Sequence, residues 1–132
     1  MSKSALYMTN TTPTPVAAGG LLQIGTITRR MGTAIRADGD AITLLEPGYY
    51  AVSVNATVQP DAAAAITLTV RENEAPIPGA TVTATPATIA DDTPLQIPGA
   101  IVRVFCRSTK TLTFVLSAAA TVANAAITVA KV

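Results

Sequence analysis

The segment from Gly48 to Gln59 constrains the fold more than any other part of the chain. Its even positions are apolar and most of its odd positions are polar: Tyr50, Val52, Val54, Ala56 and Val58 alternate with Tyr49, Ala51, Ser53, Asn55, Thr57 and Gln59. Successive side chains of a β-strand point to opposite faces of the sheet, so this pattern predicts a strand with one buried face. Pro47-Gly48 and Pro60-Asp61 are turn signals that bound it.

The same alternation recurs along the chain. We expect clear strands at 65–71, 111–117 and 125–131, and weaker ones at 5–9, 21–29, 41–45, 80–84 and 101–107. Residues 72–79 are interpreted as a hairpin connection, 108–110 as a tight turn and 118–124 as a short link. Short strands at regular spacing are typical of a sandwich or barrel, and a double-sheet jelly roll is one way to protect sheet edges.

These patterns predict an all-β, antiparallel two-sheet jelly-roll sandwich of about eight to ten strands. The length of 132 residues fits a single domain spanning 1–132. We expect residues 1–4 to form a flexible tail ahead of the first strand.

The composition is apolar and weakly charged. Hydrophobic residues make up 49% of the chain and charged residues 13%, with a net charge of +1. Average domains are about 25% charged, and a neutral surface promotes association. We therefore expect an oligomer. The charge balance gives no basis for a nucleic-acid partner, and no apolar stretch is long enough to cross a membrane.

The sequence lacks the residue combinations that usually carry out acid–base catalysis. There is no histidine, and the close carboxylate pairs are Asp38 with Asp40 and Asp91 with Asp92. We interpret both pairs as solvated loop residues; part of a calcium loop is the weaker alternative for Asp38-Gly39-Asp40, because further ligands are absent. We therefore predict no enzyme activity, no cofactor and no metal site.

The single cysteine, Cys106, rules out an intramolecular disulfide and any metal site of the Cys-x-x-Cys type. It follows Val102 and Val104 at alternate positions, which predicts that its thiol faces the core. Without a histidine to deprotonate it, we interpret it as a buried structural thiol.

The strand expected at 101–107 is apolar on both faces. Ile101, Arg103 and Phe105 alternate with the valines and the cysteine. Aromatic residues and arginine are enriched at subunit interfaces. We therefore predict a subunit interface formed by Ile101, Arg103 and Phe105 together with Tyr49. The alternative is that Phe105 lies under a neighbouring loop of its own chain.

Several motifs resemble a known family. Pro47-Gly-Tyr-Tyr-Ala-Val-Ser-Val54 resembles the Pro-Gly-x-Tyr-x-Val/Phe strand of tumour-necrosis-factor-like and complement-head-like jelly rolls. The segment 68–79 is similar to the next strand and hairpin of those domains, although Asn73-Glu74 stands where they often have Asn-Gly, which leaves the turn type open. The order of motifs, from Ala5-Leu-Tyr7 to Thr111-Leu-Thr-Phe-Val-Leu116, extends the resemblance over nearly the whole chain.

The chain is also similar to short jelly-roll proteins of tailed bacteriophages that serve as head-fibre or capsid-decoration domains. This resemblance implies a homotrimer on the capsid surface of a virion, with the major capsid protein as its partner. The alternative is a binding module of the same fold that recognises a carbohydrate, such as a host-surface glycan, or a cell-surface receptor. Tyr7 and Tyr49 are the aromatic residues we expect to be available for that role.

Overall fold

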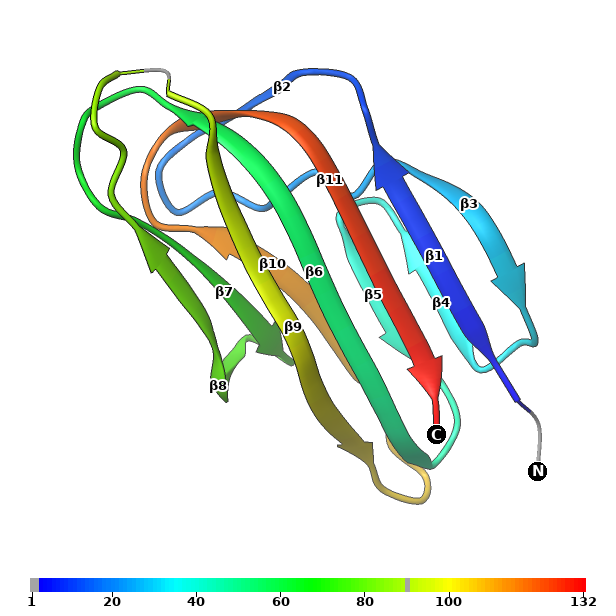
Figure 1. Ribbon diagram of the computed structural model, residues 1–132. Helices are drawn as coiled ribbons and strands as arrows, with labels where there is room; N and C mark the ends of the chain where they lie inside the picture. Colours follow the sequence, from blue (N-terminus) through cyan, green and yellow to red (C-terminus); the bar gives the residue numbers. More distant parts are fainter. Residues whose placement is uncertain (1–2, 90) are drawn as a thin grey trace.

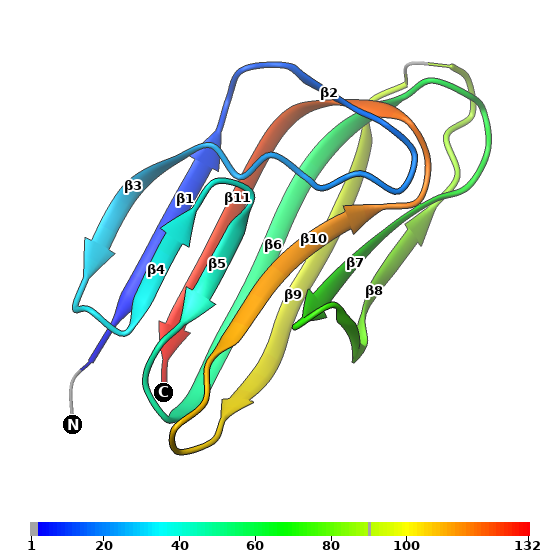
Figure 2. The same ribbon diagram turned by 180° about the vertical axis from the view of Figure 1, so that it is seen from behind.

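The computed structural model describes residues 3–89 and 91–132, and this part of the chain forms two antiparallel sheets that face each other (Figures 1 and 2). Sheet A has the strand order β3-β1-β11-β6-β9, with β2 paired to β11, and sheet B has the order β4-β5-β10-β7-β8. The strands are β1 (Ala5–Asn10), β2 (Thr14–Val16), β3 (Thr26–Met31), β4 (Ile35–Asp38), β5 (Ala41–Leu44), β6 (Gly48–Pro60), β7 (Ile66–Glu72), β8 (Ala75–Ala84), β9 (Thr93–Val104), β10 (Lys110–Leu116) and β11 (Ala120–Lys131).

The core fills the space between the two sheets. The even positions of β6 from Tyr50 to Val58 are all buried, as the alternation predicts, and they face Phe114 and its neighbours on sheet B. Fully burying a large apolar side chain contributes about 1.5–3 kcal/mol. The predicted all-β fold with two antiparallel sheets is confirmed. Among the described residues, no helix has the length and hydrophobicity of a membrane-spanning segment.

Three strands begin well before their predicted first residue, and two of them are edge strands. β8 begins at Ala75, so the connection predicted over 72–79 is only the two-residue turn Asn73-Glu74. β9 begins at Thr93, well before residue 101. Both contain prolines, which suggested loops; an edge strand tolerates proline because one of its sides needs no hydrogen bonds. β11 begins at Ala120 and keeps its pairing with β6 through a register shift between Val122 and Asn124.

The turn between β7 and β8 is held by the Asn73 side chain. Asn73 and Glu74 have φ angles of 48° and 70°, and a two-residue type I′ turn requires positive φ at both positions. The Asn73 Oδ1 accepts a hydrogen bond from the Thr111 N–H at 2.8 Å. This turn therefore uses an asparagine that bonds to the distant strand β10 in place of the Asn-Gly pair.

The strand predicted at 21–29 begins only at Thr26, although Leu22 and Ile24 before it are buried. The short strands β2, of three residues, and β4, of four, were not predicted. Of the tail expected at 1–4, Met1 and Ser2 lie outside the described residues. Ser4 is buried, its Oγ accepts a hydrogen bond from the Ala34 N–H at 3.1 Å, and its carbonyl accepts one from the Lys131 N–H at 2.9 Å.

Gly25 permits a close approach between β1 and the segment before β3. Its φ is 76°, and a Cβ added there would meet the Thr9 carbonyl and lie 2.7 Å from Asn10 Cβ. Gly25→Ala is expected to lower the unfolding free energy by about 3 kcal/mol or more, because a left-handed backbone and a backbone clash add together. Urea denaturation would measure the loss.

Gly39 provides the matched control. It has a φ of 65°, but a Cβ there would meet nothing within 4 Å. Gly39→Ala should therefore cost only the conformational penalty of about 1–2 kcal/mol. Equal losses for the two variants would show that the close approach at Gly25 contributes nothing.

Candidate interaction surface

The four residues predicted to form an interface lie together on the outer face of sheet A. Tyr49 on β6 is the cross-strand partner of Arg103 on β9, and Ile101 lies one step further along β9. The Arg103 guanidinium carbon is 4.4 Å from the centre of the Phe105 ring and 5.6 Å from that of Tyr49. Tyr49, Ile101 and Phe105 are 50%, 60% and 55% exposed. We call these four residues the aromatic–arginine patch.

Phe105 is therefore not covered by a loop of the described chain. Cys106, predicted to face the core, is exposed instead. β9 ends at Val104, and the next residues turn: the Ser108 N–H and Oγ both donate hydrogen bonds to the Phe105 carbonyl, at 3.2 and 2.9 Å. The prediction for Cys106 was wrong because the alternation was extended past the end of the strand.

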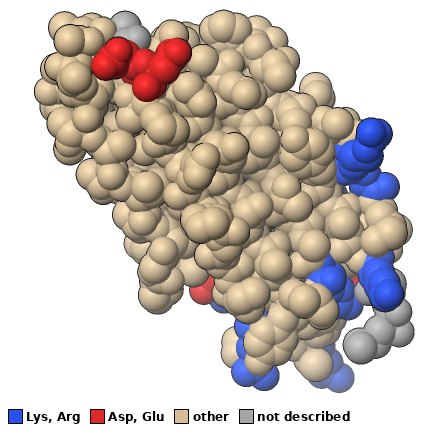
Figure 3. Space-filling model, in the orientation of Figure 1, with Lys and Arg blue, Asp and Glu red and all other residues tan. Residues whose placement is uncertain are grey.

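An uncharged row of side chains crosses the outer face of sheet A beside this patch. Cross-strand pairing links residues of all five main strands at one level: Met31, Ala5, Ala130, Ala51 and Ile101. The next outward level on the central strands holds Tyr7, Thr128 and Ser53. Figure 3 shows this face as a broad uncharged expanse with Lys and Arg at its margins. The outer face of an antiparallel sheet is normally polar, so this uncharged and partly apolar composition is unusual for a face exposed to solvent.

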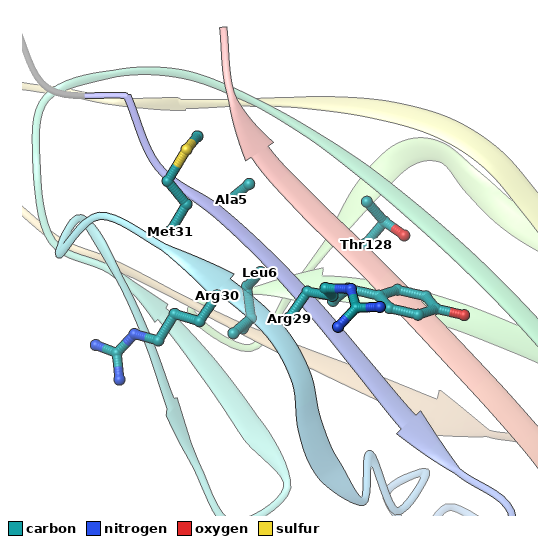
Figure 4. Close-up of a pocket in the computed structure, with 7 residues that line it drawn as sticks. Ala5, Leu6, Arg29, Arg30, Met31 and Thr128 are labelled. Carbon is teal, nitrogen blue, oxygen red and sulfur yellow. The ribbon is translucent and has the colours of Figure 1, made fainter.

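A groove lies on the same face at the opposite edge of sheet A (Figure 4). It has a volume of about 290 Å³ and is lined by residues of β1, β3 and β11: Ala5, Leu6, Tyr7, Arg29, Arg30, Met31 and Thr128. Arg29 extends on the side of Thr128, whereas Arg30 points away (Figure 4). We call this feature the β1–β3 groove. Sequence reasoning missed it, because its residues come from strands distant in the chain.

A partly buried polar cluster anchors the end of β11 behind the patch. The Tyr50 hydroxyl donates a hydrogen bond to the Glu46 carbonyl at 2.7 Å, and the Lys131 Nζ lies 3.0 Å from the Glu46 Oε1. The Val132 N–H donates to the Tyr49 carbonyl at 2.8 Å. Burial raises the pKa of Tyr50 above its ordinary value of 10.0. The ion pair between Glu46 and Lys131 could not be predicted from a local sequence pattern, because its members are 85 positions apart.

The raised pKa of Tyr50 makes stability depend on pH in the alkaline range. Its neutral form is favoured by folding, so this contribution is fully present below about pH 10 and is lost as the pH rises through the pKa of the folded state. The unfolding free energy should therefore fall more steeply between about pH 9 and pH 11 for the unmodified chain than for Tyr50→Phe. Urea denaturation across that range would measure both slopes, and equal slopes would contradict the expectation.

The two carboxylate pairs singled out in the sequence lie at the ends of strands or in the loops that follow. Asp91 and Asp92 are exposed, and Asp92 Oδ1 accepts a hydrogen bond from Gln59 Nε2 at 3.0 Å. Asp38 ends β4 and Asp40 lies in the turn that follows. Within residues 3–89 and 91–132, no group of three or more His, Cys, Asp or Glu residues is placed to hold a metal ion.

Comparison with known proteins gives structural but no sequence relatives. No protein-family model and no curated protein matches the sequence. PRD1 vertex protein P5 has a TM-score of 0.66 at 17% identity, over 98% of this chain and 73% of that one. The globular domain of zebrafish complement 1qA has a TM-score of 0.68 at 11% identity, over 99% and 97%. Eiger TNF from S. frugiperda has a TM-score of 0.67 at 14% identity, over 98% and 91%.

Identities this low establish the fold alone. The shared architecture covers almost the entire chain and includes both sheets. The predicted jelly roll is therefore confirmed: this chain folds as a tumour-necrosis-factor-like, complement-head-like jelly roll, an architecture it has in common with a vertex protein.

Proposed function

We propose that this protein is a non-enzymatic structural protein of a bacteriophage virion: a homotrimeric capsid-decoration or head-fibre module that binds the major capsid protein at the capsid surface. The observation that carries the proposal is the exposed, uncharged outer face of sheet A with the aromatic–arginine patch at one edge. The fold shared with a vertex protein supports the virion location.

A closed trimer needs two different surfaces on each chain, because a head-to-tail contact joins unlike patches around a ring. The aromatic–arginine patch lies at the β9 edge of sheet A and the β1–β3 groove at the β3 edge. Ile101 and Met31 lie at the two ends of the same cross-strand row. We propose that the patch of each copy packs into the groove of the next.

The exposed thiol of Cys106 gives a direct test of this contact. It adjoins Phe105 in the patch, while Met31 is 54% exposed and lines the groove. Met31→Cys treated with a short bismaleimide cross-linker should give a covalent trimer on a denaturing gel, because every ring contact then joins one thiol of each kind. Met31→Cys combined with Cys106→Ser should give none.

Ile89→Cys is the matched control, because Ile89 is 66% exposed but belongs to neither surface. It should give no covalent trimer with Cys106. Cross-linked dimers through Cys106 alone would mean that two patches meet each other, and the ring contact would then be wrong.

The β1–β3 groove also favours a second candidate function, a carbohydrate- or receptor-binding module. Tyr7 is 37% exposed there and lies beside Thr128, so the groove offers an aromatic face and a hydroxyl to a sugar. Tyr49, the other predicted aromatic, is committed to Arg103. A glycan array with Tyr7→Ala as control would test this function; reproducible binding that the variant loses would favour it over the groove as a subunit contact.

A further inference from the structure

Exposed cations and exposed aspartates gather at opposite ends of the described chain. Lys3 precedes β1, Arg30 is near the end of β3 and Arg107 follows β9, and all three are exposed. They lie at the end where β6 begins and β11 finishes, because Gly48 pairs with Val104 and the Lys131 N–H bonds to the Ser4 carbonyl. We call Lys3, Arg30 and Arg107 the basic end.

The opposite end is acidic. Asp61 follows the last residue of β6, and its N–H donates to the Ala119 carbonyl just before β11 begins. Asp92 is bonded to Gln59 near the same end of β6, and Asp91 is its neighbour. All three aspartates are exposed. Figure 3 shows the acidic group at one extremity of the visible face and most of the basic groups toward the other.

The basic end carries more positive charge than its own acids, Glu46, Glu72 and the exposed Glu74, neutralise. Glu46 lies 3.0 Å from Lys131, and Glu72 lies 3.9 Å from Lys110. These ion pairs use lysines other than Lys3 and leave both Arg30 and Arg107 exposed. Large apolar side chains are exposed at the same end: Leu45 is 37% and Val132 is 81% accessible.

We propose that the basic end docks on an acidic protein surface, while the acidic end faces away from it. This inference rests on the proposed function, and it names which end of the trimer meets the capsid and by what chemistry. Arginine together with exposed apolar residues is the composition of protein interfaces, and complementary charge steers and orients such contacts. A trimer would present three copies of the basic end side by side, which multiplies the attraction.

The placement of the cations favours a protein over other anions. Lys3, Arg30 and Arg107 come from three separate segments, and neither pocket described near this end is lined by two of the three. The pocket described at this end, lined by residues of 47–49 and 103–106, contains one cation, Arg103, which is already stacked on aromatic rings. A net charge of +1 with an acidic opposite end is far from the strongly basic surface of a nucleic-acid-binding domain.

Binding to immobilised poly-L-glutamate would test the proposal, with duplex DNA and phosphatidylglycerol vesicles as parallel probes. The unmodified protein should bind poly-L-glutamate, with an affinity that falls roughly tenfold between about 50 and 300 mM NaCl as charges are screened. Lys3→Gln, Arg30→Gln and Arg107→Gln combined should reduce this binding at least about tenfold at low salt. Preferential binding to DNA or vesicles would overturn the proposal.

The matched control neutralises the other end. Asp61→Asn, Asp91→Asn and Asp92→Asn combined raise the net charge by three, yet this variant should bind within about twofold of the unmodified protein, because the acidic end is remote. The variant carrying all six changes keeps the net charge of +1 and should still lose binding. Binding that simply follows net charge would contradict a directional dock.

Sedimentation of the same samples separates the two proposals. Five of the six residues belong to neither the aromatic–arginine patch nor the β1–β3 groove. Arg30 lines the groove, although its side chain points away from Thr128 (Figure 4), so Lys3→Gln and Arg107→Gln are also combined without the Arg30 change to leave the subunit contact unaltered. A trimer that does not bind poly-L-glutamate would refute only the proposal that the basic end docks on an acidic surface. A monomer that binds poly-L-glutamate through the basic end would refute the trimer alone.

Discussion

Phe105→Asp is expected to convert the proposed trimer into monomers that remain folded. The side chain is 55% exposed in the single chain, so the substitution should leave the fold intact. In the trimer it would place a carboxylate inside an apolar contact and remove an aromatic anchor, which costs about 2 kcal/mol or more at each interface. Sedimentation velocity would measure the mass, and circular dichroism would confirm that the sandwich is retained.

Ile89→Asp controls for adding a carboxylate to an exposed apolar position. Ile89 is 66% exposed and lies in the loop between β8 and β9, outside the aromatic–arginine patch. This variant should sediment like the unmodified protein. An intact oligomer in Phe105→Asp would place the subunit contact elsewhere.

Phe114→Ala is expected to cause the largest loss of stability of any single change described here. Phe114 is fully buried in the middle of β10, where it is the cross-strand partner of Val70. Truncating a buried phenylalanine costs about 3–5 kcal/mol, because the transfer free energy is lost and a cavity remains. Urea denaturation should show the loss, and working in the Phe105→Asp background removes any contribution from subunit association.

Val115→Ala is the neighbouring control on the same strand. Val115 points to the opposite face of sheet B and is only half-buried. Its truncation should cost about 1 kcal/mol or less. A loss at Val115 as large as that at Phe114 would mean that the core does not lie between the two sheets.

The parts of the fold that could be predicted are those where alternation is long enough to read. β6, β7 and β10 bury every second residue, so the inward face of each follows from the sequence. β8 and β9 were underestimated because Pro76, Pro94 and Pro98 signal loops, and only the strand order shows that both strands are edges. Edge position is a tertiary property that no local pattern contains.

The candidate surface also has one part that the sequence predicts and one part that it does not. Ile101, Arg103 and Phe105 share a strand, so their common face could be predicted, and Tyr49 joins them through the pairing of β6 with β9. The groove could not be predicted, because it needs the pairing of β3 with β1 and of β1 with β11. Ion pairs between distant segments, such as Glu46 with Lys131, likewise could not be predicted, because only the folded chain brings the two residues together.

The mass of the unmodified protein in solution tests the central proposal most directly. Sedimentation equilibrium at about 10 μM would detect any assembly with a dissociation constant in the low micromolar range or below. We expect a single species of about 40 kDa, three times the 13.4 kDa of one chain. A single species of 13.4 kDa under the same conditions would contradict self-assembly through sheet A.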